Sequence, residues 1–426
     1  AFEDLMNDKL QASPAFPKAV RTRPLLFLAV LAAVLAVASI GSAQDRRRVL
    51  RAPGLVLNTA APVAACKVVQ YTADGRFLVS AGEDKVVRIW PVIGGKLDRA
   101  NARVLRWATW REQRGSIYAM DVYFDGQKPK LVAIGGMGLK SATIVILDFA
   151  TGEVLYGLTE PQFDVSVTSL AFAPDGRRVA YGVYDGQVLE WDFSSDQPNS
   201  LKSLGQHLIK RNNQMVPSEG NQILAVHYSD TNTVLSVAAF GSVLQSTVNS
   251  TPPMLAALPL FGISDLRNVA VSGDGTRIAA CGLDRSTQKS RGEFRTWDGT
   301  DGLEIPFPER SDPVAASLNH SGTRLAFSVN DMPEDATSGE PDTTRVVLFD
   351  TERRVWLRDD LPRPTNYVDA MAFDPAGEIL AVAGGDDFEL SLWDLAQRVT
   401  QDSVRSRGSG LWGVGLSPDN NLLGFQ

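Results

Sequence analysis

The stretch YTADGRFLVSAGEDKVVRIW, residues 71–90, decides the fold, because the rest of the chain repeats it. Its pattern predicts three short strands, the first two joined by an Asp74-Gly75 turn, which is a strong short-range signal of a hairpin. A second turn at Gly82-Glu83-Asp84 leads to a third strand that ends at Trp90. Alternate residues of the second and third strands are apolar and share a face. Because a single meander of this size is marginal in water, it must stack on copies of itself.

Similar turns recur along the chain and mark further repeats. Their spacing is about 50 residues, apart from one double-length interval. That interval holds a degenerate copy, ILAVHYSDTNTVLSVAAFGSVLQ, with its turn at Ser229-Asp230. Repeats of about 40 to 50 residues with several strands each are typical of a β-propeller. The other turns are Asp125-Gly126, Asp175-Gly176, Asp274-Gly275, Ser321-Gly322, Ala376-Gly377 and Asp419-Asn420.

The ends of the third strands resemble the WD40 repeat family, in which a Trp-Asp pair closes this strand. The likeness is strongest in SAGEDKVVRIW (80–90), LAFAPDGRRVAYGVYDGQVLEWD (170–192) and MAFDPAGEILAVAGGDDFELSLWD (371–394). It covers residues 50–426 and implies an all-β WD40-like β-propeller of seven or more four-stranded blades. The residues that carry the pattern are Trp90, Trp191, Asp192, Trp297, Asp298, Trp393 and Asp394, together with the turn residues Asp84, Asp185 and Asp387.

One family feature is missing from the sequence. The family often has a Gly-His pair before the first strand of a repeat, and its His joins the Trp and a turn Asp in a hydrogen-bonded network. None of the three histidines, His207, His227 and His320, lies in such a pair. The resemblance therefore implies that this network is absent and that the Trp residues act through packing alone. We expect the turn Asp residues to accept hydrogen bonds from backbone N–H groups.

An apolar run occupies residues 25–40 and is interrupted only by Ser39. The preceding residues, 1–24, form a polar and basic lead, and small residues follow at Gly41-Ser42-Ala43. This pattern favours residues 25–43 as a signal peptide cleaved after Ala43, while basic residues on both sides leave a membrane anchor as the alternative. Both alternatives place one hydrophobic helix before the propeller and predict an exported (periplasmic or extracellular) or membrane-anchored protein.

The propeller is predicted over residues 47–426, with its last blade truncated. Seven repeats are complete, and an eighth starts at Gly410 but stops in its second strand. Two explanations remain open. Residues 47–58 supply an outer strand that completes a C-terminal blade, or the chain continues beyond Gln426. We favour continuation, since an open strand edge invites pairing with other chains.

Composition and motifs exclude several functions. The formal net charge of −7 and the pI near 5.2 argue against a nucleic-acid surface. Only Cys66 and Cys281 occur, far apart, so we predict two small core residues rather than a disulfide or a Cys-based zinc site. Three scattered histidines do not supply a metal site, and neither a nucleophile elbow nor a phosphate-binding loop occurs in the right context. We therefore predict no enzyme activity, no cofactor and no metal.

Aligning the first strand of each recognisable repeat by its turn places one residue from each in a column whose charge and size vary. Such variation is unlike packed core, so we expect the column on the rim of the ring's top face. Its Tyr and Trp are residue types that anchor interfaces. The binding candidates are Lys67, Tyr118, Thr168, Arg267, Asp369 and Trp412, and Val314 shares the column.

These features predict a non-catalytic scaffold that binds a protein or peptide and is a monomeric propeller, with membrane contact only through the N-terminal segment. A second hypothesis makes the chain the regulatory or sensing module of a larger enzyme or signalling protein. A third, a lactonase-like ring, would need converging His, Glu and Arg residues, and the shortage of His counts against it. Three insertions, 201–221, 284–292 and 330–344, are expected to be solvated loops that a partner could also touch.

Overall fold

Antiparallel strands account for all the regular structure of the residues that the computed structural model describes. The predicted hydrophobic helix, its polar lead and residues 47–58 fall within 1–60, outside the described residues. The described part contains no helix with the length and apolar character of a membrane span. It comprises residues 61–425 without 107–114, 138–143, 159–165, 196–199, 212–213, 219, 250–252, 309, 332–342, 358–360, 386, 407–413 and 417–422.

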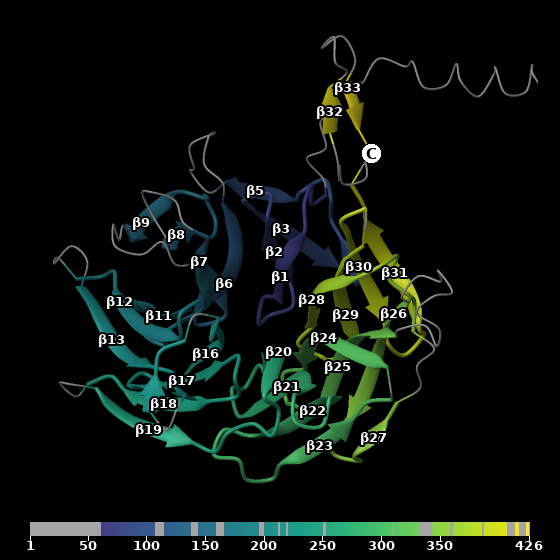
Figure 1. The fold of residues 1–426 in the computed structure, drawn as a ribbon. Coiled ribbons are helices and arrows are strands. Elements are labelled where there is room, and N and C mark those ends of the chain that lie inside the picture. Colours follow the sequence, from purple (N-terminus) through teal and green to yellow (C-terminus); the bar gives the residue numbers. More distant parts are fainter. Residues whose placement is uncertain are drawn as a thin grey trace, which may run out of the picture. The chain divides into compact units, whose positions relative to one another are not determined.

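Seven antiparallel sheets form the blades of a ring, numbered here 1 to 7 in chain order (Figure 1). Six sheets have four strands, which run outward from the centre in chain order. The sheet of blade 1 has five strands, because its third strand pairs with both of the strands that follow it. The prediction of an all-β propeller is confirmed, with seven blades. The innermost strands are β1 (Cys66–Tyr71), β6 (Ser116–Asp125), β10 (Val167–Phe172), β16 (Ile223–Asp230), β20 (Asp265–Val271), β24 (Ser311–Leu318) and β28 (Val368–Phe373).

The remaining strands follow the same order in each blade. The second strands are β2 (Phe77–Gly82), β7 (Lys128–Met137), β11 (Arg178–Val183), β17 (Thr233–Ala238), β21 (Arg277–Asp284), β25 (Arg324–Asp331) and β29 (Ile379–Gly384). The third strands are β3 (Val86–Ile93), β8 (Ile144–Asp148), β12 (Gln187–Asp192), β18 (Val243–Thr247), β22 (Lys289–Thr296), β26 (Thr343–Asp350) and β30 (Glu389–Asp394). The outer strands are β5 (Arg103–Arg106), β9 (Val154–Leu158), β13 (Ser200–Gln206), β19 (Met254–Leu258), β23 (Leu303–Pro306), β27 (Val355–Trp356) and β31 (Val399–Val404).

Residues 71–90 fold as their pattern predicts. In the β2–β3 ladder Leu78 lies opposite Trp90, and Val79 lies opposite Ile89. All four side chains are fully buried. Because successive side chains point to opposite faces, Val79 and Ile89 pack towards blade 2, while Leu78 and Trp90 pack towards blade 7. A blade therefore buries both of its faces, each against a different neighbour.

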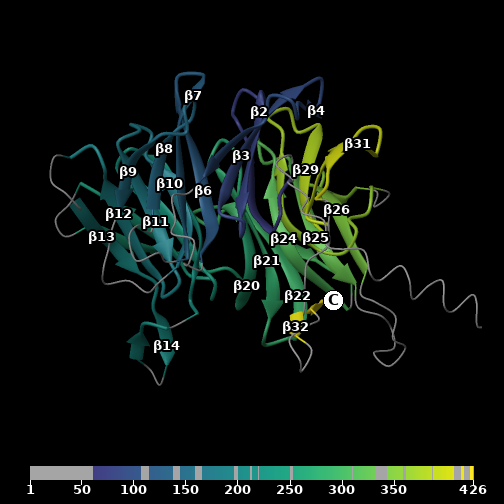
Figure 2. The ribbon, with the colours of Figure 1, turned by 90° about the horizontal axis from the view of Figure 1, so that it is seen from above.

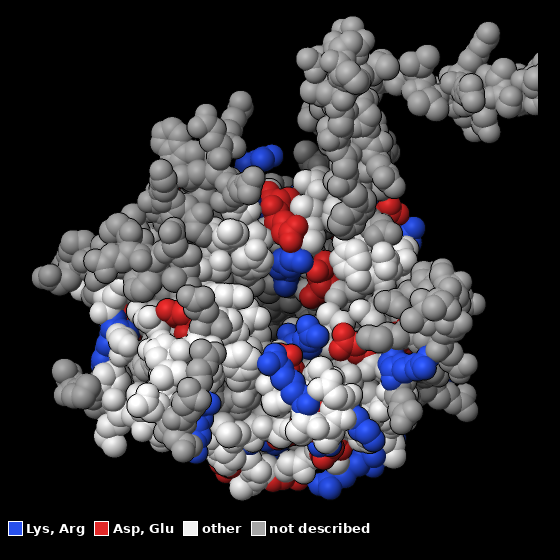
Figure 3. Space-filling view, viewed as in Figure 1, with Lys and Arg blue, Asp and Glu red and all other residues white. Residues whose placement is uncertain are grey.

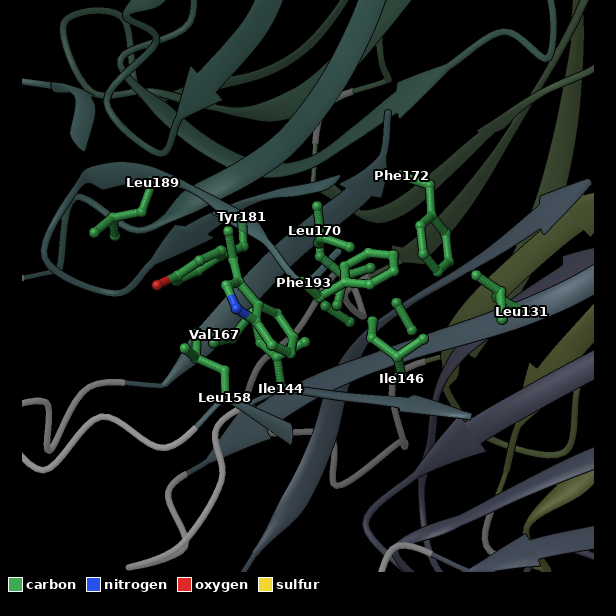
Figure 4. Close-up of a cluster of buried hydrophobic side chains, with 14 of the residues drawn as sticks. Leu131, Ile144, Ile146, Leu158, Val167, Leu170, Phe172, Tyr181, Leu189 and Phe193 are labelled. Carbon is green, nitrogen blue, oxygen red and sulfur yellow. The ribbon is translucent and has the colours of Figure 1, made fainter. Parts of the chain in front are cut away.

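The same arrangement holds all around the ring. The described core consists of seven hydrophobic clusters, and each cluster joins two adjacent blades. Figure 4 shows the cluster between blades 2 and 3, where Ile144 and Ile146 of β8 meet Val167 and Phe172 of β10. No blade of the described ring has a core of its own, so the fold is stable only as a stack of neighbours.

Blade 7 packs directly on blade 1, and an arm of blade 1 reinforces this contact. Pro91 stands where the third strands of blades 2, 3, 6 and 7 carry the closing Asp. The strand β3 runs on to Ile93 before a Gly94-Gly95 turn leads into β4 (Lys96–Leu97). The Leu97 N–H donates to Asp402 Oδ2 of β31 at 2.9 Å. Arg99 Nη2 donates to Asp402 Oδ1 at 2.5 Å and to the Ser403 carbonyl at 2.7 Å.

Blade 7 is complete without a strand from another part of the chain. All four strands of blade 7 come from β28–β31, so residues 47–58 are not required in its sheet. At the predicted eighth repeat, β32 (Val414–Leu416) and β33 (Leu423–Phe425) pair with each other and with no described strand of a blade. Within the described residues the ring thus closes with seven blades.

Three expectations about connections are wrong. The turn of repeat four lies at Thr231-Asn232, two residues after the predicted Ser229-Asp230, which belongs to β16. Residues 201–221 are not one polar connection, because they hold most of β13 and the hairpin of β14 (Ile209–Arg211) and β15 (Gln214–Val216), which projects from the ring (Figure 2). Residues 284–292 are mostly strand, since β21 and β22 extend into them.

We predict that Asp402→Ala weakens ring closure. The substitution leaves the Leu97 N–H without its acceptor and removes the partner of Arg99, so we expect a loss of about 1–3 kcal/mol in the free energy of unfolding. Urea denaturation followed by tryptophan fluorescence measures it. The control is Asp125→Ala, which breaks an ion pair with Lys130 between largely exposed side chains and should cost about 1 kcal/mol or less. Equal losses in the two variants would contradict a closing role for the arm.

Candidate functional site

The innermost strand of every blade carries a β-bulge near its start. In blade 1 the pairing of β1 with β2 passes from Cys66 directly to Val68 and leaves Lys67 out of the ladder. A bulge leaves its extra residue unpaired and re-aims that side chain. The seven residues left out in this way, which we call the bulge residues, are Lys67, Tyr118, Thr168, Leu224, Arg267, Val314 and Asp369.

Glycines make room for several of these bulges. A Cβ atom on Gly82, at the end of β2, would lie 2.0 Å from the Ala65 carbonyl oxygen. On Gly384, at the end of β29, it would lie 2.1 Å from the Tyr367 carbonyl oxygen. Because no side chain fits at such distances, glycine is required where the second strand passes the bulge. The backbone geometry of the bulge therefore depends partly on the second strand.

All seven bulge residues line one cavity at the centre of the ring, which we call the channel mouth. Its volume is about 680 Å³. It brings together five of the six predicted binding candidates, and Val314 of the same column; the sixth, Trp412, lies outside the described residues. The column is thus one surface in space, while its role in binding stays a prediction.

Leu224 is the bulge residue that the sequence alignment missed. It holds the position of blade 4 in the column. The alignment covers only the recognisable repeats and leaves out the degenerate repeat four, whose predicted turn at Ser229-Asp230 lies two residues too early. The usable signal was the Thr231-Asn232 pair, which stands at the spacing that the other Asp-Gly turns have from their bulge residues.

Charged side chains of both signs meet at the channel mouth, and Figure 3 shows them around the central opening. Lys67 Nζ lies 2.9 Å from Asp369 Oδ1 and 3.4 Å from Glu83 Oε1. Burial raises the pKa of Asp369, and the hydrogen bond from Lys67 opposes this rise. Arg267, by contrast, is exposed and has no ion-pair partner among the described residues. As far as it is described, the mouth therefore offers one cation that is free to meet a ligand.

Polar side chains also tie some of the innermost strands to the next blade. Thr168 Oγ1 donates to the Ile223 carbonyl at 2.7 Å, so this candidate already has a partner inside the ring. The Phe172 N–H donates to Asp121 Oδ2 at 2.8 Å, and Gln70 Nε2 donates to Asp121 Oδ1 at 3.2 Å. Burial raises the pKa of Asp121. These contacts hold neighbouring blades in register.

The Trp-Asp pattern has a local structural role. The Asp that closes a third strand accepts hydrogen bonds from N–H groups of the following turn: Asp394 Oδ1 from Ala396 N at 2.9 Å and from Gln397 N at 2.8 Å. Asp298 accepts from Thr300 N at 3.0 Å, and hydrogen bonds from Thr296 and Thr300 lower its pKa to about 2. Asp192 accepts from Ser194 N at 3.0 Å. These carboxylates hold the turn before the outer strand.

The Asp residues after the second strand also hold turns. Asp84 accepts from Val86 N and from Val63 N, both at 3.2 Å, and forms a buried ion pair with Arg88. Asp185 accepts from Gln187 N at 3.1 Å. The expectation of backbone capping is thus met at these two residues. At Asp387 the structure shows a different contact: its backbone carbonyl accepts from the N–H of Ser406, which follows β31, at 3.0 Å.

Blade 4 contains a histidine network of a different kind, in which the ring bonds to serines in place of Trp and Asp. His207 is 1% exposed, its Nδ1 lies 2.6 Å from Ser242 Oγ, and its Nε2 lies 2.9 Å from Ser236 Oγ. Burial lowers the pKa of His207 to about 3. The sequence did not predict this network, because His207 follows Gln206 instead of Gly and its ring bonds to serines instead of Trp and Asp.

Trp297 forms a hydrogen bond as well as packing contacts, contrary to the expectation that the Trp residues act through packing alone. Its indole Nε1 donates to the Gly275 carbonyl at 2.9 Å, and the ring stacks on His227 with centroids 6.0 Å apart. Trp90, Trp191 and Trp393 are buried in the blade-to-blade clusters.

The cysteines are core residues, as expected. Cys66 and Cys281 are free and buried, and burial raises the pKa of the Cys66 thiol to about 12. Within the described residues, no group of three or more His, Cys, Asp or Glu side chains is placed to hold a metal ion.

The comparisons with known proteins agree with this geometry. Three segments, 56–91, 152–192 and 358–394, match the family model of the WD domain, G-beta repeat, and end in the third strands of blades 1, 3 and 7. The chain carries WD40 repeats. A stretch of 162 residues is 28% identical to the Periodic tryptophan protein 2 homolog of Dictyostelium discoideum. That stretch is 37% of this chain and 16% of the relative's length. The WD40 resemblance of the third-strand ends is confirmed.

We predict that His207 makes the WD40 ring sensitive to acid. In the unfolded chain the His pKa is about 6.5, whereas in the folded chain it is about 3. Between these values the unfolded state binds the extra proton, so stability is fully present above about pH 6.5 and falls as the pH is lowered towards 3. His207→Gln should reduce the slope of unfolding free energy against pH by up to about one proton equivalent.

Urea denaturation at a series of pH values between about 4 and 7 measures this slope. The same substitution at His320, whose ring is exposed, controls for the loss of a histidine as such. An unchanged slope in His207→Gln would show that the buried ring takes no part in acid unfolding.

Proposed function

We propose that the chain is a non-catalytic scaffold that binds a protein or peptide at the channel mouth. The observation that carries the proposal is the set of seven bulges, which aim one side chain from every blade into a single cavity. The bulge residues differ in charge and size although the blades repeat. Side chains released from the repeated packing pattern in this way are suited to recognition.

The chemistry of the mouth fits a peptide-like ligand. Tyr118 and Tyr184 supply amphipathic rings, and Arg267 supplies a planar group with several donors, all of them residue types that anchor interfaces. The Lys67–Asp369 pair sets a fixed polar pattern beside them. A peptide ligand with both apolar and polar side chains can contact the rings and pair with the charged groups of the mouth. A purely apolar ligand would displace water from these charged groups without replacing its hydrogen bonds.

A second proposal makes the propeller a regulatory or sensing module of a larger protein. It is supported by the relative from Dictyostelium discoideum, in which the matched stretch is only 16% of the length. The relative is thus a longer protein, of which the matched stretch is a small part. The boundaries of the full-length gene distinguish this proposal from a free-standing scaffold.

We also propose that residues 25–43 export or anchor the protein, on the strength of their apolar run and basic lead. Fractionation of cells that express the chain with and without residues 1–43 tests this. The longer form is expected in the membrane or exported fraction and the shorter form in the cytosol. Both forms in the cytosol would rule the proposal out.

We predict that Tyr118→Ala removes binding at the channel mouth. Panning of a random-peptide phage library against the immobilised chain yields ligands whatever the natural partner is. Their affinity for Tyr118→Ala should fall about tenfold or more, as for a truncated interface anchor. Tyr156→Ala is the matched control, because Tyr156 lies on the outer strand β9 and is 44% exposed. Enriched peptides that bind Tyr118→Ala as well as the wild type would contradict the proposed site.

A further inference from the structure

A second cavity, of about 690 Å³, adjoins the channel mouth on the seam between blades 5 and 6. Its walls come from the turn and first residues of β22, from the end of β23, and from the connection to β24. Arg267 lines both cavities, so they lie side by side. We call the second cavity the seam groove.

The seam groove is basic in an acidic chain. Four cationic side chains line it, Arg267, Lys289, Arg291 and Arg310, against the two carboxylates Glu304 and Asp312. The chain as a whole carries a formal charge of −7, so this excess is not a consequence of composition. Figure 3 shows Lys and Arg side chains gathered over the blade that β20–β23 form.

The cations of the groove differ in how they are held. Arg291 is fixed by Glu304 at 3.0 Å and by Asp284 at 3.6 Å. Hydrogen bonds from Ser286 and Thr287 lower the pKa of Asp284 to about 2, so this carboxylate stays ionised and keeps Arg291 in place. Lys289 and Arg267 are exposed and have no ion-pair partner among the described residues. These two positive charges are thus left to face a ligand.

The floor of the groove is apolar and rigid. Pro306, Phe307 and Pro308 form it, and the Phe307 ring packs edge-on against Phe327 with centroids 5.0 Å apart and against Trp356 at 5.6 Å. An apolar floor below a cationic rim suits an extended chain that carries both apolar and acidic side chains. Rigid walls favour affinity, because little conformational freedom is lost on binding.

We propose that the seam groove docks an extended acidic peptide segment of a partner protein. The proposal rests on the proposed scaffold function and specifies the chemistry of its partner. Carboxylates of the segment pair with Lys289 and Arg267, apolar side chains lie on the proline and phenylalanine floor, and the segment runs on towards the channel mouth at Arg267. Charge complementarity carries the choice of partner.

The test uses three fluorescein-labelled peptides of about twelve residues, identical except that alternate positions hold Glu, Gln or Lys. Fluorescence anisotropy with the full chain should show the Glu peptide binding about tenfold or more tightly than the Gln peptide, with affinity falling as salt rises. Lys289→Glu should lower the affinity for the Glu peptide about tenfold. The double variant Lys289→Glu, Arg267→Glu should lower this affinity further. Lys128→Glu is the matched control, an exposed lysine of blade 2 with the same charge change.

Equal binding of the Glu and Gln peptides, or equal affinity in Lys289→Glu and wild type, would overturn the proposal. Tighter binding of a labelled single-stranded oligonucleotide would overturn it in favour of a nucleic acid. The scaffold function is judged separately, by phage-selected peptides and Tyr118→Ala. A failure of the acidic peptide with a sensitive Tyr118→Ala refutes the groove alone, whereas insensitivity of Tyr118→Ala refutes the mouth.

Discussion

Contact between the faces of neighbouring sheets is the interaction on which the whole structure depends. Each blade is too thin to shelter its apolar side chains, and both faces of its strands are apolar. Val79 and Ile89 need blade 2, while Leu78 and Trp90 need blade 7. A row of such sheets would leave two faces in water, and a ring leaves none. The hydrogen bond from Leu97 to Asp402 adds a polar contact to the interface between blades 1 and 7. The apolar packing of that interface resembles the packing of the other six.

Each bulge places one residue of the innermost strand outside the packing between blades. That residue can vary from repeat to repeat, while its buried neighbours cannot. Pleated residues of the innermost strand must fit a cluster, so Cys66, Val167 and Val368 are small or β-branched and buried. The bulge residue beside each of them escapes this constraint, because it stands outside the ladder. Lys67, Thr168 and Asp369 can therefore differ while the blades remain alike. The glycines of the second strands keep this geometry by admitting the close approach of two backbones.

The sequence predicted the propeller, its repeats and most of the bulge residues. The features that it did not predict each have a physical explanation. Asp-Gly turns and Trp-Asp strand ends depend on short-range backbone geometry, so they located the repeats and the column of bulge residues. The sequence alignment did not find Leu224, because the turn of blade 4 lacks glycine. The His207 contacts escaped because Ser236 and Ser242 are brought to it only by folding. The seam groove escaped because residues 284–292 are polar enough to resemble a loop, although cross-strand pairing continues as far as Asp284 and Lys289.

The consecutive order of strands within each blade has a consequence for how the chain reaches its native state. Every sheet is complete within a short span of sequence, and most packing joins adjacent spans, so nearly all contacts are local in topology. The union of blades 1 and 7 is the exception: the Lys67–Asp369 contact spans 302 positions. The entropy lost on closing so long a loop falls on this one junction, because no strand is exchanged across it. The native ring therefore has one long-range junction, where blade 1 meets blade 7.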